Sequence, residues 1–393
     1  MRMERRQGIL FAAAVLVAAL AGGLVGATLV GDPASSQDAQ SVEPTPTATG
    51  DASDAPSPSP TNSPSESANP GRGVAVDPSA ITAPPDDMPS AHVDGDLLEC
   101  GAATITVEDG DELAQALSAA GPGDVIGLAE GRYEGEFSLT ASGTAEEPLW
   151  VCGESAAAIV GEGYDGGYGL HVDGAQHVRI VGLTVTQAQK GIMVDGGEDV
   201  VIDSVTVHGI GDEGIHLRTG TIDSVVRGST VYDTGNRREK FGEGIYIGSA
   251  ESNWCDLTDC EPDRSDRNVV EGNIVFDVTA EAVDVKEGTV DGVLRGNAFD
   301  GAELIEDGGD SWVDIKGNDY EIVGNSGIRS NNDGFQTHEI LDGWGTGNVF
   351  ADNTAVVRGP GYGFSLTPER DNVVMCSNTV EEAGEGYSNT DCQ

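Results

Sequence analysis

A five-residue motif recurs eight times between residues 169 and 367, and it constrains the fold more than any other feature of the sequence. Most copies begin with Gly and continue with alternating apolar and polar residues. The copies are Gly169–Asp173, Gly191–Asp195, Gly214–Arg218, Gly244–Gly248, Ala282–Lys286, Trp312–Lys316, Gly334–His338 and Gly363–Thr367. They start 22, 23, 30, 38, 30, 22 and 29 residues apart. A minimum period near 22 with variable insertions is typical of a solenoid, in which each insertion loops out of one corner of a coil.

A second set of segments recurs between these copies. Each has an apolar pair, a turn and a further apolar residue: His177–Val185, Asp199–Val207, Asp223–Val231, Asn268–Phe276, Gly292–Phe299, Tyr320–Gly327 and Asn372–Val380. Asparagine recurs at or near the turn, as Asn273, Asn297, Asn325, Asn353 and Asn378. Stacked asparagine side chains can hydrogen-bond along a ladder, so we interpret this column as structural.

Two short strands per coil at this period predict an all-β fold, a right-handed parallel β-helix. Short strands are expected before the repeat at Val125–Leu128, Phe137–Leu139 and Leu149–Val151. An amphipathic helix is expected over residues 111–120, with Leu113 and Leu117 on one face. This helix would cap the N-terminal end of the solenoid, because an open end exposes unpaired strand edges.

The chain divides into three parts by composition, and the β-helix domain is expected over residues 96–393. Residues 31–95 are rich in Pro, Ser, Thr, Ala and Asp, which predicts a disordered linker. Residues 1–30 contain a basic start and an uncharged apolar run of 22 residues, Ile9–Val30. That run is close to the ~20 residues that span a bilayer and longer than the roughly 7–15 of a signal core. We therefore expect an N-terminal membrane anchor or a signal peptide, and in either case an extracellular domain, secreted or anchored to the outer face of the membrane.

The six cysteines are expected to form disulfides, because an exported domain folds in an oxidising compartment. The sequence does not determine their connectivity. Pairing of neighbours along the chain is the expectation, which gives Cys100–Cys152, Cys255–Cys260 and Cys376–Cys392.

The formal net charge of −47 argues against nucleic acid or an anionic membrane surface as a partner. It does not exclude an acidic polysaccharide, if a divalent cation bridges the two. The chain is expected to act as a monomer.

The repeat also predicts which side chains face outward. Positions 2 and 4 of each copy are apolar and should point into the core, so positions 3 and 5 should point out. Neighbouring coils lie about 4.8 Å apart, so equivalent residues form vertical columns. The outward columns include three glutamates (Glu213, Glu243, Glu281), two aspartates (Asp284, Asp314) and a cationic column (Lys286, Lys316, His338).

These columns predict a functional site rather than a solvated acidic face. The chain has only four lysines, and two of them, Lys286 and Lys316, end matching copies of the motif. Carboxylates stacked at this spacing repel one another, and a Ca²⁺ ion, with several oxygen ligands near ~2.4 Å, would relieve the repulsion. Glu213, Glu243, Glu281, Asp284 and Asp314 are therefore candidate calcium ligands.

The chemistry that needs these groups together is β-elimination on a polysaccharide that contains uronic acids. Calcium would bind the sugar carboxylate and stabilise the charge that develops when the C5 proton leaves. Lys286 is the candidate base; a second lysine one coil away lowers its pKa and the carboxylates raise it. Lys316 or His338 would neutralise the developing charge.

Three further residues are expected to contact the substrate. Arg218 could hold a substrate carboxylate in its guanidinium fork. Tyr246 and His216 occupy outward position 3 on neighbouring coils, and a tyrosine there would contact the sugar or donate a proton. The insertion at residues 249–267 should form a wall beside them.

The chain resembles the chondroitinase B-like and alginate lyase family of polysaccharide lyases over roughly residues 103–330. The shared opening comprises Asp111-Glu112-Leu113, Ala116-Leu117, Pro122-Gly123-Asp124-Val125-Ile126, Gly131-Arg132-Tyr133, Gly143-Thr144 and Pro148-Leu149. Glu281, five residues before Lys286, is similar to that family's calcium-binding Glu followed by its catalytic Lys. One coil later the family has Arg-His-Gly where this chain has Lys316-Gly317, and Thr279 replaces a further acidic residue. The resemblance implies a parallel β-helix lyase that uses calcium; the calcium-dependent pectate lyases are similar in logic.

Two alternatives remain open from the sequence. A parallel β-helix glycoside hydrolase needs two opposed carboxylic acids, and Asp284 and Asp314 could form that pair. A non-catalytic carbohydrate-binding protein of the cell surface would fit the anchor and the linker.

Overall fold

The computed structural model describes residues 81–306 and 308–393. The predicted anchor or signal peptide (residues 1–30) and the linker up to residue 80 lie outside the described residues. Within the described ranges, no helix combines the length and apolar character that crossing a membrane requires.

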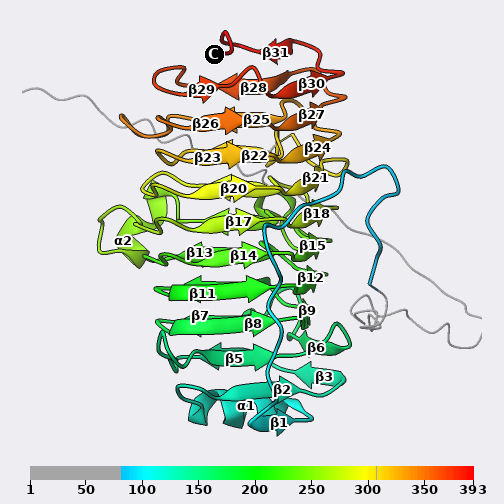
Figure 1. Cartoon of the computed structure of the whole chain (residues 1–393), viewed down its shortest axis with the longest axis vertical. Helices are drawn as coiled ribbons and strands as arrows, with labels where there is room; N and C mark the ends of the chain where they lie inside the picture. Colours follow the sequence, from blue (N-terminus) through cyan, green and yellow to red (C-terminus); the bar gives the residue numbers. More distant parts are fainter. Residues whose placement is uncertain (1–80, 307) are drawn as a thin grey trace, which may run out of the picture. The chain divides into compact units, whose positions relative to one another are not determined.

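The described chain forms three parallel sheets that stack coil upon coil (Figure 1). Sheet A consists of β1 (Ile105–Val107), β2 (Val125–Leu128), β5 (Leu149–Cys152), β8 (Gln176–Val181), β11 (Glu198–Asp203), β14 (Val225–Arg227), β17 (Val269–Glu271), β20 (Val293–Arg295), β23 (Glu321–Val323), β26 (Val349–Ala351) and β29 (Val373–Val374). Sheet B consists of β3 (Gly131–Glu134), β6 (Ala157–Val160), β9 (Thr184–Thr186), β12 (Thr206–His208), β15 (Thr230–Tyr232), β18 (Ile274–Phe276), β21 (Ala298–Asp300), β24 (Ser326–Ile328), β27 (Thr354–Val356) and β30 (Thr379–Glu381). Sheet C consists of β4 (Phe137–Leu139), β7 (Tyr168–Asp173), β10 (Lys190–Asp195), β13 (Ile215–Arg218), β16 (Ile245–Ile247), β19 (Val283–Val285), β22 (Val313–Ile315), β25 (Phe335–Thr337), β28 (Tyr362–Leu366) and β31 (Gly386–Ser388).

The predicted right-handed parallel β-helix is confirmed, but each full coil has three strands rather than two. The second repeated segment is not one strand with a bend. It splits at its turn into a strand of sheet A and a strand of sheet B. The residue at this corner adopts a left-handed conformation, with φ of 62°, 63° and 67° at Gly272, Gly296 and Gly324. Such a φ breaks a strand, and glycine tolerates it without steric cost.

The predicted asparagine ladder is confirmed at this corner. The side-chain Nδ2 of Asn273 donates to Oδ1 of Asn297. The Nδ2 of Asn297 donates in turn to Oδ1 of Asn325, and the series continues through Asn353 to Asn378. The donor–acceptor distances are 3.0, 2.8, 3.0 and 3.0 Å. Each amide also donates to a backbone carbonyl of the preceding coil, so the ladder satisfies buried polar groups at every corner.

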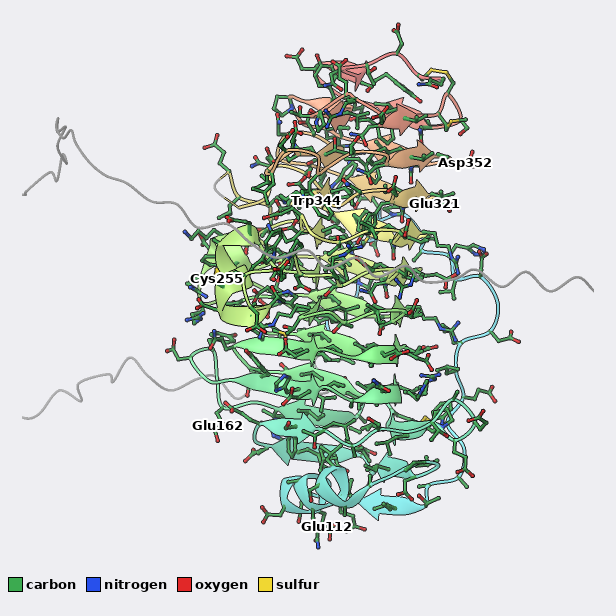
Figure 2. The ribbon with its side chains drawn as sticks, turned by 90° about the vertical axis from the view of Figure 1, so that its left-hand side faces the viewer. Glu112, Glu162, Cys255, Glu321, Trp344 and Asp352 are labelled. Carbon is green, nitrogen blue, oxygen red and sulfur yellow. A yellow bond between two sulfur atoms is a disulfide. The ribbon has the colours of Figure 1, made fainter. Side chains whose placement is uncertain are left out.

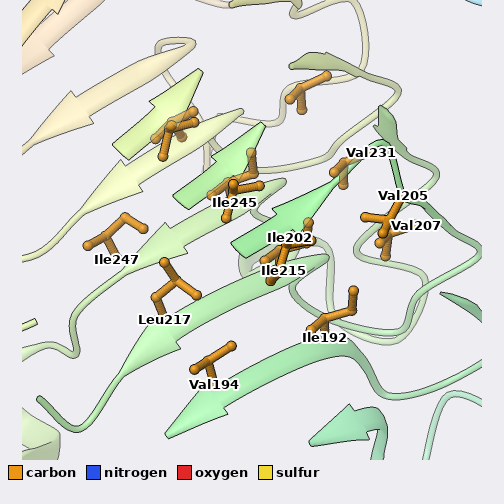
Figure 3. Close-up of a cluster of buried hydrophobic side chains, with 14 of the residues drawn as sticks. Ile192, Val194, Ile202, Val205, Val207, Ile215, Leu217, Val231, Ile245 and Ile247 are labelled. Carbon is orange, nitrogen blue, oxygen red and sulfur yellow. The ribbon is translucent and has the colours of Figure 1, made fainter. Parts of the chain in front are cut away.

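The core consists of stacked, mainly aliphatic side chains from all three sheets, and those of sheet C come from positions 2 and 4 of the motif (Figure 3). On β10, β13 and β16 these are Ile192, Val194, Ile215, Leu217, Ile245 and Ile247, all essentially inaccessible to solvent. Towards the C-terminus, Phe335 stacks on Phe364 with ring centroids 5.1 Å apart. The inward alternation predicted from the sequence therefore holds along sheet C.

A helix, α1 (Gly110–Ala119), lies at the N-terminal end of the described coils (Figure 1). The side chain of Asp109 accepts a hydrogen bond from the backbone N–H of Glu112, which is an N-cap. Leu113 and Leu117 are buried against the first strands. The three disulfides join Cys100–Cys152, Cys255–Cys260 and Cys376–Cys392, the pairs expected from the sequence.

Residues 81–95, which the sequence places in the linker, follow the outside of the coils (Figure 1). Asp87 forms an ion pair with Arg329 at 2.6 Å, and the N–H of Asp94 donates to Oε1 of Glu271 at 2.8 Å. Because Arg329 and Glu271 belong to different coils, this segment, which precedes β1 in the sequence, packs along the outside of the solenoid.

Candidate active site

The candidate site lies on the outer face of sheet C, across β13, β16, β19 and β22. In the parallel register, Tyr246 lies beside Asp284, and Asp284 lies beside Asp314. His216 precedes Tyr246 in the same column. The columns predicted from the repeat are therefore real neighbours on adjacent strands.

The side chains at position 3 face outward, yet they are buried. His216, Tyr246, Asp284 and Asp314 expose between 1% and 8% of their surface. Stacking along the column contributes, since the rings of His216 and Tyr246 lie 4.1 Å apart. Charges in this setting are poorly screened by water, and their mutual interactions are stronger than on an open surface.

Two lysines and two aspartates form one connected ion-pair network. Nζ of Lys286 lies 2.6 Å from Oδ2 of Asp284. Nζ of Lys316 lies 2.7 Å from Oδ1 of Asp284 and 2.6 Å from Oδ2 of Asp314. Asp314 also accepts a hydrogen bond from Nδ1 of His338 at 2.8 Å. The network joins five predicted residues, Lys286, Asp284, Lys316, Asp314 and His338, in an alternating arrangement of basic and acidic groups.

This arrangement raises the pKa of both lysines. Burial alone would lower the pKa of Lys286, but the charge of Asp284 and its bond to the ammonium outweigh burial. Burial would also lower the pKa of Lys316, but the charges of Asp284 and Asp314 raise it, and they outweigh both burial and the opposing charge of Lys286. The lowering effect between the lysines is seen at Lys316, where Lys286 opposes the rise without preventing it; at Lys286 the carboxylates prevail.

Three carboxylates lie together next to this network. Glu243, Glu281 and Asp284 each offer an oxygen, and these atoms lie within 4.8 Å of one another. Burial, followed by the charge of Glu213, raises the pKa of Glu243 well above its usual value. Burial and the charge of Asp284 raise the pKa of Glu281 to about 8. Both glutamates therefore favour the protonated form or a bound cation.

The donor set fits a divalent cation at two of these carboxylates. Lys190 pairs with Glu213, and Lys286 and Lys316 pair with the two aspartates. Within residues 81–306 and 308–393, Glu243 and Glu281 form no ion pair, and Oε2 of Glu243 is buried without a hydrogen-bond partner. Two uncompensated carboxylates match the charge of Ca²⁺, which prefers oxygen ligands. Asp284 would be a further ligand if it released one lysine.

Glu213 lies at the edge of this cluster and has a partner that the sequence interpretation missed. Nζ of Lys190 lies 2.9 Å from its Oε1. Lys190 directly precedes its motif copy, in the same column as the glutamates, so the repeat contained the signal. His216 donates from Nε2 to the backbone carbonyl of Gly248 at 2.7 Å, which leaves Nδ1 facing Glu213 at 3.9 Å.

The guanidinium fork of Arg218 is already occupied on one edge by an aspartate of the chain. Its Nε and Nη2 atoms donate to the two carboxylate oxygens of Asp195 at 2.7 and 3.2 Å, and Nη2 also contacts the hydroxyl of Tyr168. Asp195 is the outward-facing residue at the same position one coil earlier. Its carboxylate makes the two-point contact with the guanidinium that was expected from a substrate carboxylate. Asp195 therefore holds the Nε/Nη2 edge of Arg218, and the predicted contact of Arg218 with substrate stays a prediction; the residue lines the cleft beside the site.

The insertion after β16 forms a wall beside these residues. It contains the short helices η2 (Glu251–Asn253) and α2 (Trp254–Leu257), and Cys255 marks its position in Figure 2. A cleft of about 390 Å³ lies between the insertion and the loop that holds η1 (Glu239–Phe241). Its lining includes Lys190, Glu213, His216, Arg218, Arg238, Phe241, Tyr246, Ser249, Asn253, Asp256 and Leu257. The sequence predicted the wall, but it gave no indication of Arg238 and Phe241.

This architecture is also found in proteins of known structure. The family model for the right-handed β-helix region matches residues 159–263. The chain is similar to the crystal structure of an alginate lyase from Paenibacillus sp. str. FPU-7, with 35% identity and a TM-score of 0.67 over 73% of this chain and 99% of that one. It is also similar to pectate lyase Pel9A (16% identity, TM-score 0.44, 68% and 72% of the two chains) and to a mannuronic acid-specific family 6 lyase from human gut microbiota (14%, 0.37, 71% and 83%). No curated protein matches the chain in sequence.

Proposed function

The chain belongs to the right-handed parallel β-helix polysaccharide lyases, and on this premise we propose that it cleaves a uronic-acid polymer by β-elimination with calcium. The observation that carries the proposal is the juxtaposition of three carboxylates with Lys286 on the outer face of sheet C. The relative of 35% identity is an alginate lyase, so alginate is the first substrate to test.

The reaction needs a base, a cation near the sugar carboxylate and a proton for the leaving oxygen. The base removes the C5 proton, the C4–O bond breaks, and a double bond forms between C4 and C5 without water. Bound calcium would supply positive charge that stabilises the sugar carboxylate as C5 loses its proton. Glu243 and Glu281 would hold the ion, with Asp284 beside them.

Lys286 is our candidate for the group that accepts the C5 proton. Its ammonium lies between Asp284 and the ring of Tyr246, whose centroid is 5.1 Å from Nζ. To act as a base it must first lose its own proton, and the negative charge around it opposes that loss. Neutralisation of Glu243 and Glu281 removes part of this opposition, so the carboxylate cluster and the base would act together.

Tyr246 and His338 are the candidates for the remaining steps. Burial, then the charge of Asp284, raises the pKa of Tyr246 well above its usual value, so the phenol keeps a proton that it can donate to the leaving oxygen. The hydrogen bond that His338 donates to Asp314 raises the pKa of His338, whose side chain is more than a third exposed. Lys316 is buried between two aspartates, so we assign it to positioning them.

The ion pairs argue against a hydrolase that uses Asp284 and Asp314. The acid of a glycoside hydrolase needs a raised pKa, so that it is protonated when it meets substrate. Burial would raise the pKa of Asp314, but Lys316 and His338 lower it well below the usual range. Asp284 is held by two lysines.

A panel of alginate, pectate, chondroitin and heparin-type polymers tests the proposal, each with calcium or with a chelator. A lyase releases an unsaturated, ultraviolet-absorbing product, whereas a hydrolase releases only reducing ends. We expect unsaturated product from at least one polymer and loss of activity with the chelator. Absence of unsaturated product from every polymer would exclude the lyase, and binding without turnover would favour a carbohydrate-binding protein. The extracellular location and the monomeric state remain part of the proposal.

A further inference from the structure

The cleft beside Tyr246 borders the proposed reaction centre, but its lining does not include Lys286 or the carboxylates Glu243, Glu281 and Asp284. Its volume of about 390 Å³ is at the small end of the roughly 300–1,000 Å³ typical of ligand sites. Tyr246 forms the boundary, because it lines the cleft on one side and lies beneath Nζ of Lys286 on the other. A polymer that places one sugar at Lys286 would therefore place a neighbouring sugar in the cleft.

Arg238, on one wall of the cleft, shares its carboxylate partner with a second arginine. Asp212 is fully buried and pairs with both Arg237 and Arg238. Burial would raise the pKa of Asp212, but its bonds to the two guanidinium groups lower it, so it stays ionised. Because one carboxylate is shared between two guanidinium groups, Arg238 has no carboxylate partner of its own.

Arg238 presents its guanidinium to the cleft. Its Nε and Nη2 atoms contact Asp212, which leaves the donors of Nη1 for a ligand. The guanidinium lies 4.2 Å over the ring of Phe241, and 47% of the side chain is exposed. A guanidinium supported in this way can donate to a carboxylate with little loss of side-chain entropy.

The opposite wall is held rigidly by one buried aspartate. The carboxylate of Asp263 accepts hydrogen bonds from the N–H groups of Thr219 and Gly220 and from the hydroxyls of Ser249 and Ser265, at 2.8–2.9 Å. These bonds tie both ends of the insertion to the corner after β13. The wall is therefore a fixed part of the cleft.

Two exposed polar residues of this wall, Asn253 and Asp256, line the cleft. A carboxylate and an amide accept hydrogen bonds from sugar hydroxyls, whereas Arg238 on the facing wall prefers an anion. A uronic-acid residue carries both kinds of group, a carboxylate on one side of the ring and hydroxyls elsewhere.

We propose that this cleft binds a uronic-acid residue adjacent to the one that loses its proton, with its carboxylate on Arg238 and its hydroxyls on Asn253 and Asp256. The inference rests on the proposed function, since it assigns a neighbouring subsite to the same polymer. A substrate that fills both positions must contain two uronic-acid residues in succession. A polymer in which each uronic acid stands between neutral sugars would not fill both positions.

The test compares Arg238→Gln with Arg267→Gln. Arg267 has a similar exposure (46%) and its own aspartate partner, Asp223, but it does not line the cleft. In Arg238→Gln, Asp212 retains Arg237, so the fold should persist. On the polymer that the wild type cleaves, Arg238→Gln should raise KM by about 10- to 100-fold with kcat changed by less than about threefold. Asp256→Asn should raise KM less, and Arg267→Gln should leave both constants unchanged.

A binding measurement keeps the subsite testable if no polymer is cleaved. Native gels that contain polygalacturonate or alginate should retard the wild type, and gels with the neutral methyl ester of polygalacturonate should not. Arg238→Gln should lose about 10-fold or more in affinity for the acidic polymers. Equal KM and equal retardation for Arg238→Gln and Arg267→Gln would overturn the subsite. Loss of kcat without a change in KM would also overturn it, whereas binding through Arg238 without unsaturated product would overturn only the lyase.

Discussion

Lys316 belongs to the coil after Asp284, yet its Nζ lies 2.7 Å from Oδ1 of Asp284, 32 positions away in sequence. The same ammonium lies 2.6 Å from Asp314 on its own strand, and all three side chains are buried. A single cation therefore bridges carboxylates of two coils and links β19 to β22.

Replacement of Lys316 should destabilise the fold strongly. Lys316→Met keeps most of the side-chain volume but leaves two buried carboxylates with one fewer cation. Breaking a buried ion pair in this way costs about 3–5 kcal/mol in the free energy of unfolding. Urea denaturation measures the change, and Lys240→Met, at an exposed lysine, should stay within about 0.5 kcal/mol of the wild type. Equal effects of the two variants would contradict a structural role for Lys316.

The asparagine ladder should be equally sensitive at its centre. Oδ1 of Asn325 accepts from the backbone and side chain of Asn297, and its amide donates to Leu294 and Asn353. Asn325→Ala leaves several of these buried groups unpaired, at about 1–3 kcal/mol each. Thermal and urea unfolding should show the loss, whereas Asn253→Ala on the exposed insertion should be near neutral. A near-neutral Asn325→Ala would mean that water replaces the amide.

The sequence predicted the elements that depend on local pattern. The period, the inward positions and the Asn ladder each leave a signal in residue spacing, because every coil must bury the same positions. It did not predict the third strand, since a single left-handed residue such as Gly296 divides one apolar segment into two strands without changing its composition.

The sequence predicted which outward-facing residues lie beside one another on neighbouring coils, and the strand register agrees. The pairing of their side chains was not predictable, because register fixes where Lys316 starts but not that its long side chain crosses to Asp284. Nor could register show that Asp195 occupies the fork of Arg218. The cleft residue Arg238 comes from a loop outside the repeat, so no column pointed to it.

Loss of the candidate base should abolish turnover. Lys286→Ala removes the proposed proton acceptor, and such a group contributes about 10²- to 10⁴-fold to rate. Lys286→Arg keeps the positive charge beside Asp284 but cannot release a proton at ordinary pH, so it should be equally inactive. The rate of unsaturated product measures both, with circular dichroism as the check on folding. Full activity of either variant would exclude Lys286 as the base.

Calcium should stabilise the protein through Glu243 and Glu281. A ligand at about 100 times its dissociation constant adds about 2.7 kcal/mol to the free energy of unfolding. We expect a rise in Tm when calcium replaces chelator, and Glu281→Gln should lose most of that rise. Glu287→Gln is the matched control, since Glu287 is a buried glutamate outside the carboxylate cluster. A calcium response retained in Glu281→Gln would remove this residue from the ligand set.

Without calcium, the free energy of unfolding should fall as pH rises. Burial and Asp284 raise the pKa of Glu281 in the folded state to about 8, from 4.5. The folded state therefore holds this proton more tightly than the unfolded state. Its stabilising contribution is complete below pH 4.5 and is lost as pH rises to about 8.

His338 also has a raised pKa, through its bond to Asp314, and it adds to the same trend. Glu243, whose pKa burial and the charge of Glu213 raise well above its usual value, contributes in the same direction. The wild type alone cannot separate these groups, but Glu281→Gln removes the contribution of Glu281, because a neutral amide does not titrate. Urea denaturation in chelator across this pH range should show a smaller fall for Glu281→Gln than for the wild type. Calcium should also reduce the fall in the wild type, because a bound cation favours the ionised carboxylate at every pH. If the free energy of unfolding falls equally with pH for the wild type and for Glu281→Gln in chelator, Glu281 does not hold a proton in this pH range. The carboxylate of Glu281 would then be ionised and stabilised by the neighbouring lysines.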